Sequence, residues 1–267
     1  MQICVLGDAH LDVVVSVTGP LAEDTDTPAT THVGVGGQGA NVAAWVAALG
    51  ARSRLVAPRG TDVAARLLAE DLARRGVDLV GPVMPGRTGV VVALSDGGRR
   101  RSMLTDRGVG SQIAPADLAS DWLDGCDWLH VAGYSLAAEP AHATAVAAMR
   151  MAAARSVRLS IDVSSTTLIE AYGAGRFRQL LTAVTPDVIF GTQAEAALLG
   201  ADLADRLVIK LGKAGVRVAG RRYPARPTVA VDATGAGDAF AAGYLIGGVN
   251  LGLTAAAQAV ARMGGMP

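Results

Sequence analysis

The sequence predicts an α/β protein, built as a three-layer sandwich in which a mostly parallel central sheet lies between two layers of helices. Short apolar runs alternate along the chain with longer stretches whose apolar residues repeat at helical spacing. Repeated strand–helix units of this kind place helices on both faces of a parallel sheet. With 267 residues, 51% of them hydrophobic, the chain can bury one large core, so residues 1–267 are expected to form a single domain.

The individual elements follow in order from these patterns. The strands are expected in the short apolar runs at residues 3–7, 53–58, 127–133, 157–163, 187–192 and 206–212. Helices are expected at residues 39–51, 62–76, 139–156 and 192–200, with a further helix beginning near Gly237. Ligands of such folds bind beyond the carboxyl ends of the strands, so the site is expected at that edge of the sheet.

Two regions lack intervening helices and have the alternation typical of β-hairpins. One contains "LDVVVSV" and "THVGVG", and the other is "TGVVVALSDGGRRRSMLT", with its turn at Asp96, Gly97 and Gly98. Small strands of this kind suggest a β-lid over the sheet. We expect the lid to consist of residues 11–19, 28–36, 87–94 and 99–106.

The composition excludes several classes of protein. A formal net charge of +0 provides no field for nucleic acid or an anionic membrane. Lys210 and Lys213 are the only lysines, and neither stands in a G-x-x-x-x-G-K-[ST] phosphate loop. Cys4 and Cys126 form neither a disulfide framework nor a metal-ligand spacing. The amino terminus resembles a first strand rather than a signal peptide, so the protein is expected to be cytoplasmic.

The first glycine cluster, "GVGGQGAN", contains the spacing G-x-G-x-x-G at Gly34, Gly36 and Gly39. This spacing suggests a dinucleotide-binding fold and therefore an NAD(P)-dependent oxidoreductase as one alternative. That fingerprint requires a strand directly before the glycines and an acidic residue after the next strand. Here the preceding residues are polar, and the next strand ends in Pro58 and Arg59. A tight turn before a packed helix is the purely structural alternative.

The second cluster, "DATGAGD" at residues 232–238, is more specific. A helix beginning near Gly237 exposes unpaired backbone N–H groups and the positive end of its dipole, and small side chains allow an anion to approach them. Asp238 would repel an anion, but it could accept the proton of an alcohol during phosphoryl transfer. The structural alternative is a carboxylate that only compensates the helix dipole.

The combination of "GGQGANVA" near the amino terminus with "DATGAGDAFAAGYL" near the carboxyl terminus resembles the two signatures of the ribokinase-like, or pfkB, carbohydrate kinase family. The resemblance covers nearly the whole chain in order. It implies a ribokinase-like fold and transfer of the γ-phosphate of ATP to an alcohol group of a small sugar or sugar acid. It also implies ATP and Mg2+ as cofactors, with a monovalent cation as a further candidate.

The resemblance also implies roles for individual residues. The catalytic residues would be Asp238 as the base, with Gly235, Ala236 and Gly237 in the anion hole. Acceptor hydroxyls would be bound by Asp12, Gly36, Gly37 and Asn41. The nucleotide would be bound by Lys210, Gly212, Thr234 and Glu195, and Glu195 would act on the magnesium indirectly.

Three features depart from the family pattern. Thr192 stands where family members often have asparagine, three residues before Glu195, which affects the expected magnesium water network. Gln38 stands where a lysine is common, so a charged contact to the substrate is absent there. The carboxyl end, "GLTAAAQAVARMGGMP", is shorter than the usual last helices and leaves the adenine contacts near Gln258 open.

Other polar residues are less specific. The run Arg99 to Arg101 is typical of a charged hairpin edge, with a phosphate clamp as the alternative. Asp162 ends a strand and either faces the site or serves the core. The histidines share no spacing with one another or with carboxylates, and a structural or surface role is expected for His10, His32, His130 and His142.

The amino-acid composition of the expected lid also bears on the class of acceptor and on the assembly of the protein. Residues 11–36 and 87–106 contain no Phe, Tyr or Trp on which a base could stack. Their short polar groups suit sugar hydroxyls, so a sugar is favoured over a nucleoside of the adenosine or pseudouridine type. A sensor that lost the chemistry is a further alternative, although Asp238 and Glu195 are both present. A homodimer formed through the lid is the expected assembly, with no nucleic-acid or membrane partner.

Overall fold

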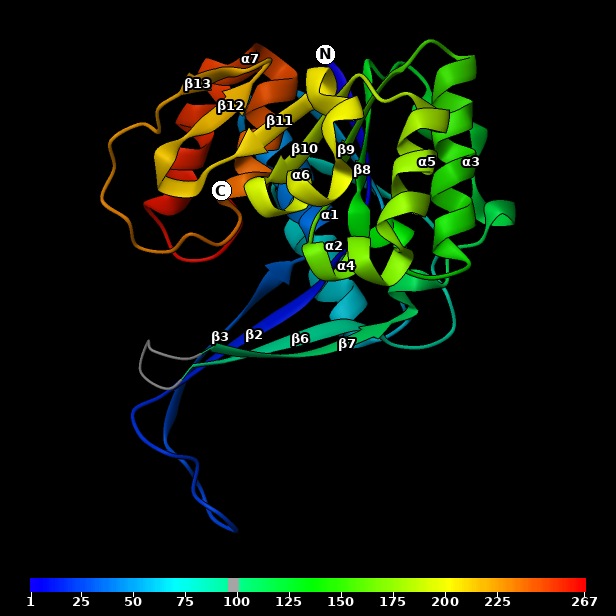
Figure 1. Ribbon diagram of the computed structural model, residues 1–267. Coiled ribbons are helices and arrows are strands. Elements are labelled where there is room, and N and C mark those ends of the chain that lie inside the picture. The colour runs from blue at the N-terminus through cyan, green and yellow to red at the C-terminus, as the bar shows by residue number, and fades with distance from the viewer. Residues whose placement is uncertain (96–100) are drawn as a thin grey trace.

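The computed structural model describes residues 1–95 and 101–267. Among these residues, the main sheet has the strand order β13-β12-β11-β10-β9-β8-β1-β4-β5 (Figure 1). The strands β12 and β13 are antiparallel to their neighbours, and the other pairings of this sheet are parallel. In chain order the strands are β1 Gln2–Leu6, β4 Arg52–Val56, β5 Val77–Val80, β8 Trp128–Ala132, β9 Arg158–Asp162, β10 Val188–Thr192, β11 Leu207–Lys210, β12 Val216–Val218 and β13 Arg221–Tyr223.

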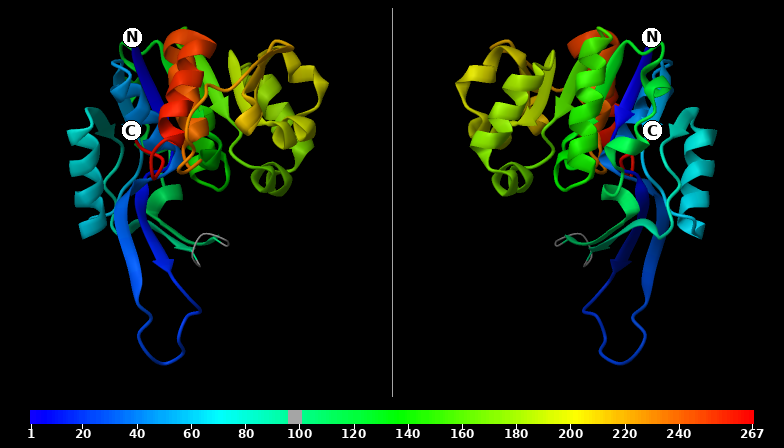
Figure 2. Two further views of the ribbon diagram at one scale, coloured as in Figure 1. Left: turned by 90° about the vertical axis from the view of Figure 1, so that its left-hand side faces the viewer. Right: turned by 90° about the vertical axis from the view of Figure 1, so that its right-hand side faces the viewer.

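Helices cover both faces of this sheet, which confirms the predicted α/β sandwich (Figure 2). One face is covered by α1 Gln38–Ala48, α2 Val63–Arg74 and α7 Ala236–Val260. The other face is covered by α3 Ala141–Ala154, α4 Thr166–Tyr172, α5 Ala174–Val184 and α6 Gln193–Leu199. The sequence analysis named no helix at residues 166–184. Gly173, with a φ of 89°, separates α4 from α5, so neither helix leaves a long periodic run.

The central strands of the main sheet, β1, β8, β9 and β10, are buried almost throughout, and their side chains alternate between two hydrophobic cores. In β1, Ile3 and Val5 belong to the core under α1 and α7. Cys4 and Leu6 belong to the core under α3 and α5. Because successive side chains of a strand point to opposite faces, an unbroken apolar run is what a doubly covered strand requires.

A second sheet, of order β3-β2-β6-β7, projects from the body of the molecule (Figure 1). It consists of β2 His10–Val17, β3 Ala29–Gly36, β6 Thr88–Ser95 and β7 Arg101–Gly108. Its central pairing, β2 with β6, is parallel, whereas the two outer pairings are antiparallel. The expected turn at Asp96–Gly98 and the arginines Arg99 and Arg100 lie outside the described residues, as does the side chain of Arg101.

Helix α7 is long and apolar enough to cross a membrane if only length and composition are considered. Half of its most apolar stretch is buried inside the protein, where it packs against α1. Gly247 and Gly248 have non-helical backbone angles and divide it by a kink. These features are those of a core helix in a folded domain.

The amino end of α1 is held against the carboxyl end of β1 by two glycines. A Cβ atom on Gly39 would lie 2.7 Å from the Cα atom of Gly7. Only hydrogen atoms fit between these two backbones. The helix therefore begins directly beside the edge of the sheet where ligands of α/β folds bind.

We predict that Gly39→Ala lowers the free energy of unfolding by roughly 1–3 kcal/mol, because the added methyl group must displace backbone atoms. Gly175→Ala in α5 is the matched control, since a Cβ atom there meets no neighbour within 4 Å. Urea denaturation measures both. Equal transition midpoints for the two variants would contradict the tight contact.

Candidate active site

Asp8 follows β1 and caps the amino end of α1. Its carboxylate oxygen Oδ1 accepts the backbone N–H of Gly39 at 3.3 Å. Its carbonyl oxygen accepts the N–H of Ala40 at 3.1 Å. A carboxylate at this position also compensates the positive end of the helix dipole.

His10 and Asp12 extend this polar group along β2. The distance from His10 Nε2 to Asp12 Oδ1 is 3.1 Å, and the distance from His10 Nδ1 to Asp8 Oδ2 is 3.7 Å. Gly36 on the neighbouring strand leaves room for this arrangement, because a Cβ atom there would overlap the Asp12 carboxylate. A Cβ atom on Gly37, the N-cap of α1, would likewise overlap the Asp8 carbonyl oxygen.

The first turns of α1 and α7 meet through a hydrogen bond between side chains. Asn41 Nδ2 donates to Asp238 Oδ2 at 2.9 Å, although the two residues are 197 positions apart. Helix α7 begins at Ala236 with Gly235 as its N-cap. The N–H groups of its first turn have no partner within the helix, so Asp238 stands beside a set of backbone donors.

The loop before α7 is held by the other aspartate of the glycine cluster. Asp232 Oδ1 accepts the backbone N–H and the hydroxyl of Thr234 at 3.0 and 2.7 Å, and its Oδ2 accepts the N–H of Gly264 at 3.0 Å. Gly235 has a φ of 73°, and a Cβ atom there would overlap the backbone of Gly265. The two aspartates therefore differ in role, since Asp232 fixes the loop that positions Asp238.

A buried ion pair supplies the positive charge of the site. Lys210 Nζ, at the end of β11, lies 2.6 Å from Asp162 Oδ2, at the end of β9. The Asp162 side chain is only 1% exposed. A Cβ atom on Gly237 would lie 3.3 Å from Lys210 Nζ, so this ammonium group stands directly beside the first turn of α7.

Glu195 and Thr192 form a capping box at the start of α6. The Thr192 N–H donates to Glu195 Oε2 at 2.7 Å, and the Glu195 N–H donates to Thr192 Oγ1 at 3.3 Å. Thr192 therefore preserves the N-cap that asparagine would also provide. Glu195 is buried, and its charge contributes to the electrostatics of Lys210.

The pKa values of Asp238 and Lys210 reflect this shared environment. Removal from water, together with the charges of Asp162 and Asp8, raises the pKa of Asp238 to about 7, although the hydrogen bond from Asn41 and the charge of Lys210 oppose the shift. Burial by itself would lower the pKa of Lys210. The carboxylates around Lys210, above all Asp162, outweigh burial and raise that pKa. Asp238 can therefore exchange a proton near neutral pH while Lys210 stays charged.

A cavity of about 660 Å3 opens beside the first turn of α7. Lys210, Gly212, Ala236 and Gly237 line its polar end. Its other walls are largely apolar and come from the β12–β13 region, the loop before α7 and the second half of α7, with Val216, Pro227, Phe240, Leu253, Ala257 and Val260 among them. Volume and lining suit a nucleotide whose phosphates point to the helix terminus.

The structure thus places the residues that the sequence analysis expected to bind the acceptor in two groups. Asp12 and Gly36 lie beside Asp8 and His10, and Asn41 contacts Asp238. Glu195, Thr234 and Gln258 do not line the 660 Å3 cavity.

The sequence analysis missed the roles of Asp8 and His10 and left Asp162 open. Asp162 ends a strand at the ligand-binding edge, which was its only signal. Asp8 and His10 stand in the same "GDAHLD" segment as Asp12, and this proximity could have indicated them.

The model of the pfkB family of carbohydrate kinases matches residues 1–265. The chain belongs to the pfkB family of carbohydrate kinases. It is therefore an ATP-dependent phosphotransferase that acts on an alcohol group, which confirms the expectation from the two signatures.

Individual relatives agree with this family. A fructokinase of Klebsiella pneumoniae is 30% identical over 92% of this chain and 84% of the relative. An ATP-dependent ribose-1-phosphate kinase of Halopiger xanaduensis is 32% identical over 79% of this chain and 72% of the relative. An E. coli protein described as a ribokinase II, solved in complex with ATP and Mg2+, has a TM-score of 0.85 at 19% identity, covering 99% of this chain and 94% of that one. This last likeness shows that the fold is ribokinase-like.

We predict that kcat/KM falls below about pH 7, since only the ionised form of Asp238 can accept a proton. The Asn41 hydrogen bond lowers the pKa of Asp238, so Asn41→Ala should shift this acid limb to higher pH. The matched control is Gln179→Ala, which removes an exposed amide on α5. An unshifted limb in Asn41→Ala would show that Asp238 does not govern the profile.

Proposed function

We propose that this kinase phosphorylates a hydroxyl group of a small sugar or sugar acid, with Asp238 as the general base. The observation that carries this proposal is the Asp238 carboxylate, whose pKa is raised to about 7 at the amino end of α7, beside Lys210. Asp238 takes the proton of the hydroxyl group, and the oxygen attacks the γ-phosphorus. The bond between the γ-phosphorus and the bridging oxygen breaks, and ADP leaves.

The backbone donors of Gly235 and Gly237 and the ammonium group of Lys210 stabilise the charge that grows on the transferred group. The N–H of Ala236, which here donates to the Ala233 carbonyl at 3.3 Å, would join them only by leaving that carbonyl. Asp162 is a positioning residue, because its carboxylate holds Lys210 against the first turn of α7. Gly212 lines the nucleotide cavity, and Thr234 holds the loop beneath it through Asp232.

The acceptor hydroxyls bind to Asp12 and Asn41, with Gly36 and Gly37 forming the wall beside them. A sugar is favoured over a nucleoside. Tyr134 lines the small cavity next to Asp8, but the guanidinium of Arg107 lies 4.9 Å from the centre of its ring and covers that face. A base would therefore have to displace Arg107 in order to stack on that face of Tyr134.

Glu195 lies directly behind the wall of the nucleotide cavity, because Thr192 lines that cavity and its N–H donates to Glu195 Oε2, so water-mediated binding of Mg2+ fits the residues present. No group of three His, Cys, Asp or Glu side chains suited to a metal occurs within residues 1–95 and 101–267. Mg2+ commonly keeps several waters and binds through one or two carboxylates together with substrate phosphates. Glu195 would hold it indirectly, through water, and the ion would neutralise charge on the phosphates of ATP. A requirement for a monovalent cation stays a prediction.

The second sheet is proposed as a lid that closes over the acceptor and excludes water. A single domain with this lid and a cytoplasmic location belong to the same proposal, consistent with two unpaired cysteines.

The decisive test is Asp238→Asn, which keeps the size of the side chain and removes the base. We predict a fall in kcat of about 10²–10⁴-fold, the usual range for general base catalysis. ATP should still bind, because the cavity and Lys210 are unchanged, and calorimetry measures this. Turnover close to that of the wild type would overturn the mechanism.

We predict a homodimer in which a second copy covers the lid. Val33 on β3 and Met103 and Leu104 on β7 are each more than half exposed, at 54%, 53% and 57%. The double variant Val33→Asp with Leu104→Asp should be monomeric by light scattering at micromolar concentration. Val83→Asp is the control, since Val83 is equally exposed outside the lid. A monomeric wild type would contradict the dimer.

A further inference from the structure

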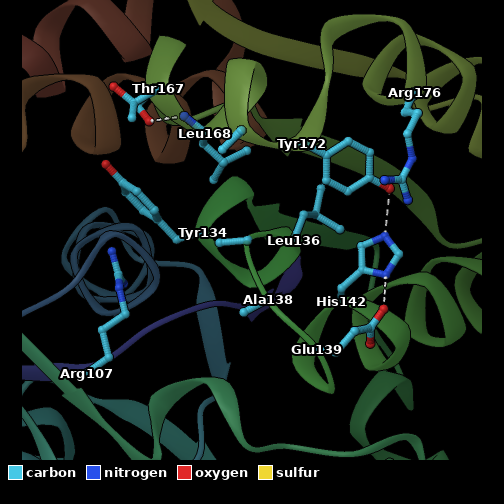
Figure 3. A pocket seen from close by; sticks show the side chains of 13 residues that line it. Arg107, Tyr134, Leu136, Ala138, Glu139, His142, Thr167, Leu168, Tyr172 and Arg176 are labelled. Carbon is cyan, nitrogen blue, oxygen red and sulfur yellow. Dashed lines mark hydrogen bonds and ion pairs between the residues drawn. The ribbon is translucent and has the colours of Figure 1, made fainter.

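A second cavity, of about 590 Å3, lies beyond the carboxyl ends of β8 and β9 (Figure 3). Its walls come from the end of β7, from the segment after β8, from α3 and from the α4–α5 pair. Tyr134 stands on one side of the cavity, and Tyr172 stands on the other. None of the residues that the sequence analysis assigned to the site lines this cavity.

This cavity adjoins the acceptor side of the active site. Arg107 and Tyr134 line both this cavity and a smaller one, of about 140 Å3, which contains Asp8 and His10. On the opposite wall, Ser165 follows Ser164, whose hydroxyl group donates to Gln38 at the start of α1. A ligand bound beside Asp8 and His10 could therefore extend past Arg107 and Tyr134 into the larger cavity.

Two arginines give the cavity its charge. The Arg107 guanidinium lies 4.9 Å from the centre of the Tyr134 ring, and the Arg176 guanidinium lies 5.1 Å from the centre of the Tyr172 ring. Arg107 reaches Asp8 only at 3.9 Å. Arg176 has no ion pair or hydrogen bond within the described part of the chain. Both cations are thus held by aromatic faces, which leaves their N–H donors available to a ligand.

The one carboxylate of the cavity is already engaged. Glu139 Oε1 lies 2.9 Å from His142 Nδ1, and its Oε2 accepts the N–H of Ala143 at 3.2 Å. His142 Nε2 lies 2.8 Å from the Tyr172 hydroxyl. This chain of contacts holds the Tyr172 ring beside Arg176 and occupies both carboxylate oxygens of Glu139 (Figure 3). The groups that remain for a ligand are the two guanidinium groups, which can only donate, and the hydroxyl groups of Tyr134, Ser165 and Thr167, which can donate as well as accept.

We propose that the acceptor of this kinase carries an anionic group, a phosphate or a carboxylate, which binds in this cavity through Arg176, on the side opposite Arg107 (Figure 3). The inference rests on the proposed function, because it assumes that the reacting hydroxyl group lies at Asp238. A neutral sugar would leave the guanidinium group of Arg176 without an oppositely charged partner. An anionic group accepts charge-assisted hydrogen bonds from it, and these are about twice as strong as neutral ones.

The test compares pairs of acceptors of which one member carries an anionic group and the other does not. ADP release is measured for ribose against ribose 1-phosphate and ribose 5-phosphate, for fructose against fructose 6-phosphate, and for glucose against gluconate. The wild type should prefer an anionic member of at least one pair by tenfold or more in kcat/KM. If the sugar phosphates are preferred, the anionic group of the acceptor is a phosphate. If gluconate is preferred, it is a carboxylate.

Arg176→Gln should reduce that preference by about tenfold or more, as expected for loss of a hydrogen bond to a charged group. Arg176→Lys should restore part of it. Arg178→Gln is the matched control, since Arg178 is on the same helix but lines a different cavity. Calorimetry with the same acceptors and a non-hydrolysable ATP analogue measures binding independently of turnover.

Equal kcat/KM values within each pair, or an unchanged preference in Arg176→Gln, would overturn the inference. Failure of every anionic acceptor to bind would also overturn it. In each case, loss of turnover in Asp238→Asn with a neutral sugar would leave the proposed mechanism intact. Retained turnover in Asp238→Asn would instead reject the mechanism itself.

Discussion

The hydrogen bond between Asn41 and Asp238 joins the first turns of two helices that are far apart in the chain. Helix α1 reaches this point because Gly7 and Gly39 allow it to begin against the end of β1. Helix α7 reaches it because Asp232 ties the preceding loop to Gly264. Both helices pack on the same face of the sheet, so the positive ends of their dipoles meet at one place. An anionic substrate and an ionisable carboxylate can therefore share this place.

Charge balance around Lys210 explains why Asp238 is poised to exchange a proton. The ammonium group is surrounded by the carboxylates of Asp162, Asp238 and Glu195. Asp162 holds the closest contact, and its burial makes that pair difficult to separate. Burial disfavours the charged form of Asp238, and the positive charge of Lys210 offsets this effect only in part. The pKa of Asp238 is therefore close to neutrality. The same ion pair thus fixes the position of Lys210 and leaves Asp238 able to exchange a proton near neutral pH.

Asp8 connects this centre to the second sheet and to the cavity between Tyr134 and Tyr172. It caps α1, pairs with His10 and lies within ionic reach of Arg107 at the end of β7. Arg107 in turn lines both the 590 Å3 cavity and the 140 Å3 cavity. A movement of β7 would therefore displace Arg107 and change its contact with Asp8. This link gives a physical route by which closure of the second sheet and acceptor binding would depend on each other.

The sequence alone determined the fold class, the family and the two glycine loops. Apolar periodicity and the need for glycine beside a helix terminus are local properties, so they can be recognised without coordinates. The strand segments expected for the second sheet differ from β2, β3, β6 and β7 by one or two residues, and α4 and α5 were missed because Gly173 divides them.

Only the tertiary structure decided which groups act on one another. The pairs Asn41 with Asp238, Lys210 with Asp162 and Arg107 with Tyr134 all join residues that are distant in the chain. Strand order decides whether such residues meet. The pKa of Asp238 and the donors around the 590 Å3 cavity follow from burial and charge at those meeting points, which no local pattern in the sequence encodes.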